Sequence, residues 1–137
     1  KSGSAPVKAA ARGETTVGIV FMHDAVAMQV DGFPIKAVAP CEGTGFEIGS
    51  MSIVKGARNL KEAKVWYDWA LSADAQSHMK DAKSFQLPSN RNAAISEYAP
   101  RFENIKLIDY DFKTYGATEK RKALLSRWDK EIGASAQ

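Results

Sequence analysis

The sequence lacks several features that would assign a chemistry directly. It has a single cysteine, Cys41, which excludes an internal disulfide framework and a zinc site made of several cysteines. Its apolar runs are far shorter than the ~18 residues that a membrane-spanning helix needs, so none of them predicts a span. A phosphate-cradling P-loop and a GxGxxG turn after a strand are also absent.

The composition is typical of one ordinary globular domain. The chain has 137 residues, of which 45% are hydrophobic and 26% are charged. The formal net charge is +3, but the basic residues are scattered, and the densest cluster (KRK, 120–122) shares a predicted helix with acidic residues. We interpret this cluster as a solvated helix face and expect no nucleic-acid partner. Because the chain begins with Lys, at what looks like a loop joined to a helix, we expect it to be part of a longer chain.

Strand and helix patterns alternate along the first half of the sequence. The apolar runs TVGIVFM (16–22) and IKAVA (35–39) are typical of strands buried on both faces. In a third run, 46–54, the apolar side changes near Gly49, which predicts a bulge or a strand that passes between two environments. Helices, whose Trp and Tyr side chains we expect in the core, are predicted at residues 4–12, 23–31, 59–70, 73–83 and 118–132. The alternation predicts an α/β fold.

Polar groups follow these predicted strands, where ligands of open α/β sheets bind. His23 and Asp24 follow the first strand, the turn EGTG (42–45) follows the second, and Glu47 lies just inside the third. Carboxylates accept hydrogen bonds from sugar hydroxyls, and a histidine also donates. These groups predict a polyhydroxylated ligand, and the free amides of the loop Ser2-Gly3-Ser4 at a helix start are suited to a negative group.

Each of these residues also has an ordinary structural explanation. Asp24 is a candidate N-cap, Ser2 and Ser4 are candidate caps, and a backbone carbonyl is a candidate partner for His23. Glu47 is harder to explain structurally, because a partly buried carboxylate needs partners. A histidine beside an aspartate in sequence does not form a catalytic triad, and the metal-site signal of His23, Asp24 and Glu47 is weak. We therefore expect no enzyme activity, no metal and no cofactor.

Several segments, taken in order, resemble a known family. They are APVKAAARGE (5–14), VGIVF (17–21), PCEGT (40–44), SIVKGA (52–57) and WALSADAQ (69–76). Together they are similar to the C-terminal half of periplasmic solute-binding proteins of ABC transporters, in the branch that binds ferric iron, phosphonate or hexose phosphate.

The resemblance implies two α/β lobes, joined by crossover strands, that close on a ligand. Residues 1–40 would belong to one lobe, 41–110 to the crossover and the other lobe, and 111–137 to a C-terminal helix near the hinge. It also implies a periplasmic location, an ABC permease as partner and a missing N-terminal half. Without that half, we expect self-association by exchange of elements.

The resemblance further implies the ligand. Ferric-binding members have adjacent tyrosines where this sequence has His23 and Asp24, which argues against iron. His23, Asp24 and Glu47 are similar to the sugar-contacting set of the hexose-phosphate-binding members, and the 2–4 loop would assist with the phosphate. Thr44 of the glycine-rich turn is a further candidate ligand-binding residue. The predicted function is capture of a sugar phosphate. The alternatives are iron, phosphonate or phosphoglycerate on the same fold, or an enzyme with His23 and Glu47 as acid and base.

Overall fold

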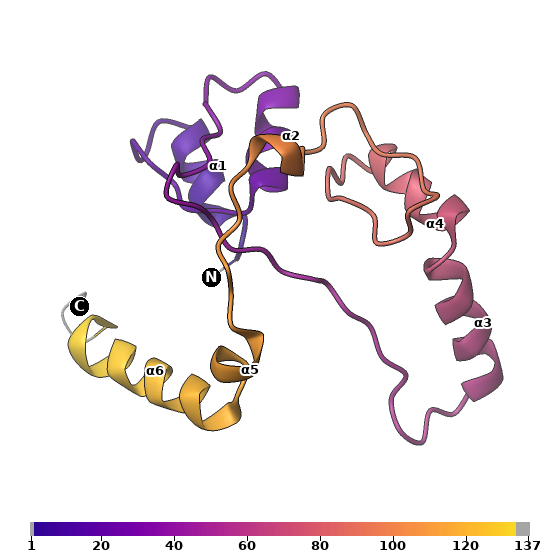
Figure 1. The fold of residues 1–137 in the computed structure, drawn as a ribbon. Helices are drawn as coiled ribbons and strands as arrows, with labels where there is room; N and C mark the ends of the chain where they lie inside the picture. The colour runs from indigo at the N-terminus through magenta and orange to yellow at the C-terminus, as the bar shows by residue number, and fades with distance from the viewer. Residues whose placement is uncertain (1, 134–137) are drawn as a thin grey trace. The chain divides into compact units, whose positions relative to one another are not determined.

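A computed structural model describes residues 2–133; Lys1 and residues 134–137, the outer ends of the predicted domain ranges, lie outside the described residues. Helices joined by turns and extended segments make up this part of the chain (Figure 1). In order they are α1 (Ala5–Ala11), α2 (Met22–Val30), α3 (Leu60–Ala70), α4 (Ala73–Ser77), the 3-10 helices η1 (His78–Lys80) and η2 (Phe102–Asn104), α5 (Phe112–Tyr115) and α6 (Thr118–Glu131).

The predicted helices are confirmed, with differences at their ends. The hydroxyl of Ser72 accepts a hydrogen bond of 3.1 Å from the amide of Ala75 and so caps α4. The helix predicted over 73–83 is shorter, because α4 passes into η1 and then into a turn. Asn59 is the N-cap residue of α3 but makes no side-chain cap bond. The positive φ of Gly13, 76°, follows the end of α1 as expected of a stop.

The predicted strands are not formed in residues 2–133, so the sheet of the α/β expectation is corrected for this part of the chain. Segments 16–21, 35–39 and 46–54 run without regular secondary structure, and we call them the extended segments. Hydrophobic alternation indicates that a segment is suited to burial, but a strand also needs a neighbour that supplies ladder hydrogen bonds. Val17 is 76% exposed and Ile19 91% exposed, so these two apolar side chains have little cover within the described residues.

Extended segments are nevertheless placed against helices. A Cβ on Gly18 would lie 2.7 Å from the carbonyl oxygen of Pro6, so only glycine permits this approach to α1. Met51 and Ile53 are half-buried, whereas Phe46 and Ile48 are exposed. The bulge or change of environment predicted near Gly49 stays a prediction, because no strand is formed there within the described residues.

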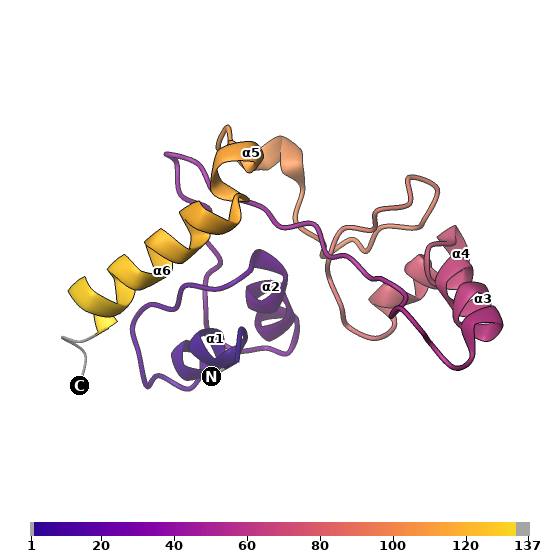
Figure 2. The same cartoon turned by 90° about the horizontal axis from the view of Figure 1, so that it is seen from below.

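The structure divides into two units, residues 1–106 and 107–137, which are described separately. In the first unit α1 packs against α2, and α3 contacts α4 (Figure 2). Its buried apolar side chains are few and mostly small. They are Val7, Ala11, Ala25, Phe85, Ala93 and Ala99.

A network of side-chain hydrogen bonds fixes the segment that follows η1. The side-chain oxygen of Gln76 accepts a hydrogen bond of 2.8 Å from the backbone amide of Asn90. The side-chain nitrogen of Gln76 donates to the Ser89 hydroxyl at 3.0 Å. Asn90 in turn donates to the carbonyl of Leu71 at 2.8 Å. This network holds a loop in which Phe85 is only 3% exposed.

In the second unit Asp111 caps α5, accepting a hydrogen bond of 2.9 Å from the amide of Thr114. Hydrogen bonds from the Thr114 side chain and then from the Thr114 amide hold the pKa of the Asp111 carboxyl below its ordinary value. An apolar stripe runs along α6 and is half-exposed. Its members are Leu124, Leu125, Trp128 and Ile132. The lobe boundaries predicted from the resemblance stay predictions.

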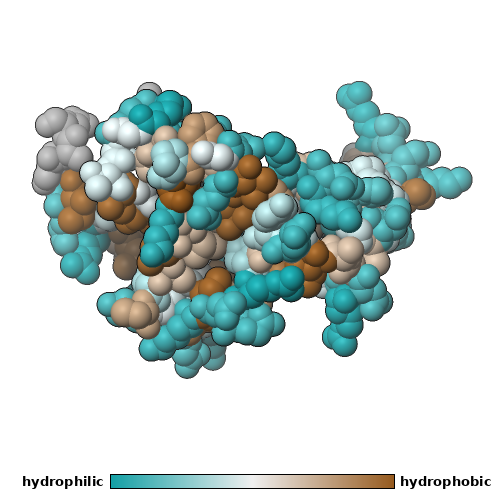
Figure 3. All heavy atoms as spheres, turned by 90° about the horizontal axis from the view of Figure 1, so that it is seen from above, coloured by the Kyte–Doolittle hydropathy of each residue, from teal (hydrophilic) through white to brown (hydrophobic). Residues whose placement is uncertain are grey.

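The expectation that the helix tryptophans lie in the core is wrong for this chain. Trp66 and Trp128 are each 60% exposed, and Trp69 is 51% exposed. Apolar side chains are visible between polar ones on the molecular surface (Figure 3). None of the helices within residues 2–133 is long and apolar enough to span a bilayer.

Candidate ligand-binding site

His23 and Asp24 lie in the first turn of α2. Phe21, not Asp24, is the N-cap residue, so the N-cap interpretation of Asp24 is wrong. The Asp24 amide donates to the carbonyl of Phe21 at 3.1 Å, and an acidic side chain here is stabilised by the helix dipole. His23 Nε2 lies 3.8 Å from Asp24 Oδ1, and each side chain is 26% exposed. The pair is therefore held together and still accessible to a ligand.

Other side chains hold the His23 ring. The Phe21 ring stacks on it with a centroid distance of 5.5 Å and an interplanar angle of 13°. His23 Nε2 also lies 3.3 Å from Nε2 of Gln86. Among the described residues its polar partners are thus side chains, not the backbone carbonyl that we considered. Sequence reasoning missed Gln86, whose one signal was its place in the polar 85–90 loop.

Thr44 is fixed by its backbone. Its amide donates to the carbonyl of Lys106 at 2.9 Å, and its hydroxyl donates to the carbonyl of Gly45 at 3.4 Å. Gly43 supplies the positive φ of the turn, 121°. Hydrogen bonds from the Glu42 amide and then from the Cys41 thiol hold the pKa of the Glu42 carboxyl below its ordinary value. The turn thus presents a half-buried hydroxyl beside an ionised carboxylate.

Glu47 is exposed, so the partial burial expected of it is wrong for this chain. Within residues 2–133, no hydrogen bond or ion pair joins Glu47 to His23 or Asp24. The same part of the chain holds no group of three His, Cys, Asp or Glu side chains placed to bind a metal ion. The convergence of Glu47 on the histidine–aspartate pair stays a prediction.

The loop before α1 brings its two serines together. The hydroxyls of Ser2 and Ser4 lie 3.3 Å apart, and the carbonyl of Ser2 accepts from the amide of Ala5 at 3.1 Å. Ser4 is the N-cap residue but makes no side-chain cap bond, so its hydroxyl is not used as the capping interpretation requires. A Cβ on Gly3 would meet nothing within 4 Å, which leaves the loop open on that side.

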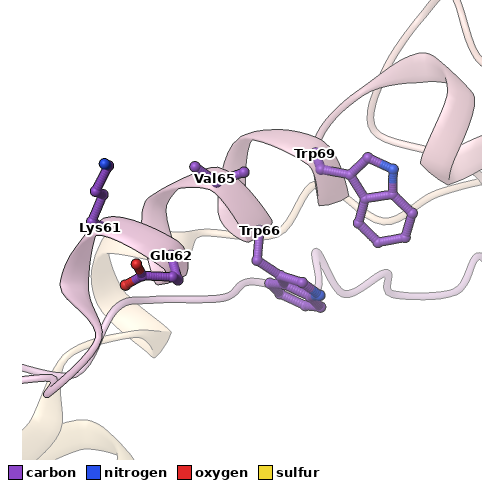
Figure 4. A pocket seen from close by; sticks show the side chains of 5 residues that line it. All are labelled: Lys61, Glu62, Val65, Trp66 and Trp69. Carbon is purple, nitrogen blue, oxygen red and sulfur yellow. The ribbon is translucent and has the colours of Figure 1, made fainter.

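Apolar grooves lie elsewhere, along α3. One is lined by Val65, Trp66 and Trp69, with Lys61 and Glu62 on the first turn of the helix (Figure 4). The other lies between Trp66 and the 51–57 segment, where the Tyr67 hydroxyl donates to the carbonyl of Met51 at 3.4 Å. Neither groove has the converging polar groups that a polar ligand requires, so they are separate from the candidate site.

Comparison with known proteins gives this geometry a context. A family model of the bacterial extracellular solute-binding proteins matches residues 2–114. The chain belongs to this family. In this solute-binding protein, the matched region includes every residue of the candidate site.

Two solved structures are similar to this solute-binding protein. The periplasmic binding protein AfuA from Actinobacillus pleuropneumoniae, with exogenous fructose-6-phosphate bound, is 48% identical with a TM-score of 0.89; the match covers 97% of this chain and 42% of AfuA. The periplasmic binding protein P5PA is 33% identical with a TM-score of 0.82, covering 91% of this chain and 40% of P5PA. The chain therefore has the fold of part of a periplasmic binding protein.

An uncharacterized protein of Haemophilus influenzae is 47% identical over 133 residues, which are 96% of this chain and 38% of that protein. The chain thus spans about two fifths of the length of the relatives that it matches.

Proposed function

We propose that this chain is part of the periplasmic solute-binding component of an ABC importer, which captures a sugar phosphate between two α/β lobes joined by crossover strands. The main support is the 48% identity to AfuA, whose structure holds fructose-6-phosphate. The extended segments support the two-lobed arrangement, since they have the apolar patterns of buried strands although no strand is formed within residues 2–133. The ligand would then be passed to a membrane permease.

The observation that carries the proposal is the accessible pair of His23 and Asp24 at the start of α2. The Asp24 carboxylate accepts hydrogen bonds from sugar hydroxyls, and a ring nitrogen of His23 donates to them or accepts from them. Charge-assisted hydrogen bonds of this kind are among the strongest between a protein and a neutral sugar. In a closed cleft from which water is excluded, they contribute more to affinity than on an open surface.

Closure of the lobes would add Glu47 and Thr44 to this pair, and an exposed Glu47 in this chain is accessible to such an approach. The hydroxyls and amides of Ser2, Gly3 and Ser4 would assist with the phosphate, and sequence outside this chain would supply most phosphate contacts. Binding without chemical change fits these groups, because no activated nucleophile accompanies them within the described residues.

Titration calorimetry with fructose-6-phosphate on the full-length protein tests the proposal. We expect Asp24→Ala and Glu47→Ala each to weaken binding by about tenfold or more, which corresponds to about 1.4 kcal/mol of binding free energy. Asp74→Ala, an exposed position on α4 away from the site, is the control and should bind as the parent does. Unchanged affinity in both site variants would remove the site assignment.

A ligand panel separates the remaining alternatives. Fructose-6-phosphate should raise the unfolding temperature of the full-length protein, because a ligand that binds the native state stabilises it. Ferric iron, a phosphonate and phosphoglycerate should raise it less. Recovery of unchanged sugar phosphate after long incubation and release is expected for a binding protein, whereas a product would favour the enzyme alternative.

A further inference from the structure

The segment 83–86 contacts both ends of the helix that carries the candidate site. Helix α2 begins beside His23 and ends at its C-cap residue, Asp31. Lys83 contacts Asp31, and Gln86, three residues on, contacts His23. Both contacts join residues more than fifty positions apart in the sequence, and both lie in the same unit of the structure.

At the C-terminal end of α2, Lys83 Nζ lies 2.7 Å from Asp31 Oδ1. Lys83 is the one non-glycine residue with a positive φ among residues 2–133, at 53°. This left-handed conformation is unfavourable for a lysine and persists only where its surroundings hold it. It turns the chain out of η1 and into the 84–90 loop.

At the N-terminal end, the Gln86 amide meets His23 at 3.3 Å. Gln86 follows Phe85, whose buried ring packs edge-on against Tyr98 with centroids 5.6 Å apart. Because Phe85 is buried, the backbone of the next residue is restricted. The side chain of Gln86 therefore reaches His23 from a restricted backbone position. An amide nitrogen only donates, so the His23 Nε2 that Gln86 Nε2 meets is the unprotonated, accepting nitrogen of the ring.

We propose that Gln86 is a positioning residue for ligand binding, which sets the orientation and tautomer of His23, and that Lys83 fixes the register of α2 against the same segment. This inference rests on the proposed function for its effect on affinity. A histidine held between Gln86 and the Phe21 ring loses less conformational freedom when a sugar binds. Removal of Gln86 therefore weakens binding through His23.

A double-mutant cycle on the full-length protein, with fructose-6-phosphate as the probe, tests this route. Gln86→Ala should weaken affinity about fivefold in the parent and less than twofold in the His23→Ala background. The exposed ion pair makes Lys83→Ala the milder change, about twofold or less. Lys80→Ala, an exposed lysine of η1, is the matched control and should have no effect.

An equal loss from Gln86→Ala in both backgrounds, or no loss in the parent, would overturn the positioning role. If the parent binds the sugar and His23→Ala weakens binding while Gln86→Ala does not, this inference fails and the proposed function stands. A parent that binds no sugar phosphate contradicts the proposed function instead. The nitrogen NMR signals of the His23 ring, read without ligand, then decide: they should shift in Gln86→Ala and not in Lys80→Ala, and unchanged signals overturn the inference.

Discussion

Two regions of the chain differ in how their side chains find hydrogen-bond partners and apolar contacts. One is the stretch 72–99, and the other is the set of extended segments 16–21, 35–39 and 46–54. In 72–99, Ser72, Gln76 and Asn90 bond to nearby backbone, and Phe85 is buried. In the extended segments the side chains are suited to burial, yet Val17 and Ile19 face outward. The first region makes these contacts within the chain, whereas Val17 and Ile19 have little cover within residues 2–133.

The difference follows from the range of the interactions involved. In a helix, each backbone amide bonds to the carbonyl four residues earlier. In a polar loop, side chains that are near in sequence supply the partners of the backbone groups. A parallel strand closes them only with another strand, brought from a distant part of the sequence. A chain that spans about two fifths of its relatives therefore keeps helices and polar loops more readily than it keeps a sheet.

The largest effect is expected at the buried side chain of Phe85 in the region 72–99. Phe85→Ala should lower the free energy of unfolding of the full-length protein by about 3–5 kcal/mol, because it leaves a cavity next to Tyr98. Phe102→Ala, at a side chain that is 54% exposed, is the control and should cost far less. Equal losses, measured by urea unfolding, would show that the 85–99 loop has no core of its own.

A smaller but more decisive effect is expected in an extended segment. If residues 16–22 form a buried strand in the full-length protein, Ile19→Ala should cost about 2–4 kcal/mol, although Ile19 is almost fully exposed in this chain. Thr15→Ala, an exposed position just before the segment, should be close to neutral. A neutral Ile19→Ala would contradict the buried strand and remove the contrast between the two regions.

How far the sequence predicts the fold depends on the same range of interactions. The spacing of apolar residues and the cap at Ser72 locate the helices to within a few residues, because those signals are local. The short α5 and η2 were missed, since single turns carry too few residues for a period to show. The runs at 16–22 and 35–39 predict burial, which Val17, Ile19 and Val38 do not show within residues 2–133. The pattern carries no information on which strand would lie beside them.

The candidate site divides in the same way. His23 and Asp24 are neighbours in the sequence and remain together in the structure, so a local motif locates them. Gln86 lies 63 positions from His23, and only the folded turn after η1 brings it there. Glu47 is a case in which the sequence pattern fails. It is exposed in this chain, and the pattern does not specify which other residues would bury it.

The smallest effect is expected at Gln76, a polar residue of the region 72–99, and it tests what holds the loop in place. Gln76→Ala removes the acceptor of the Asn90 amide and the donor to Ser89, and it should lower the free energy of unfolding by about 1–2 kcal/mol. Hydrogen exchange should then increase at the Asn90 amide but not within α2, because the lost bonds lie between α4 and the loop. Lys80→Ala, with an exposed side chain on η1, should leave both unchanged. Unaltered exchange at Asn90 in Gln76→Ala would mean that apolar packing around Phe85, rather than the hydrogen-bond network, holds the loop.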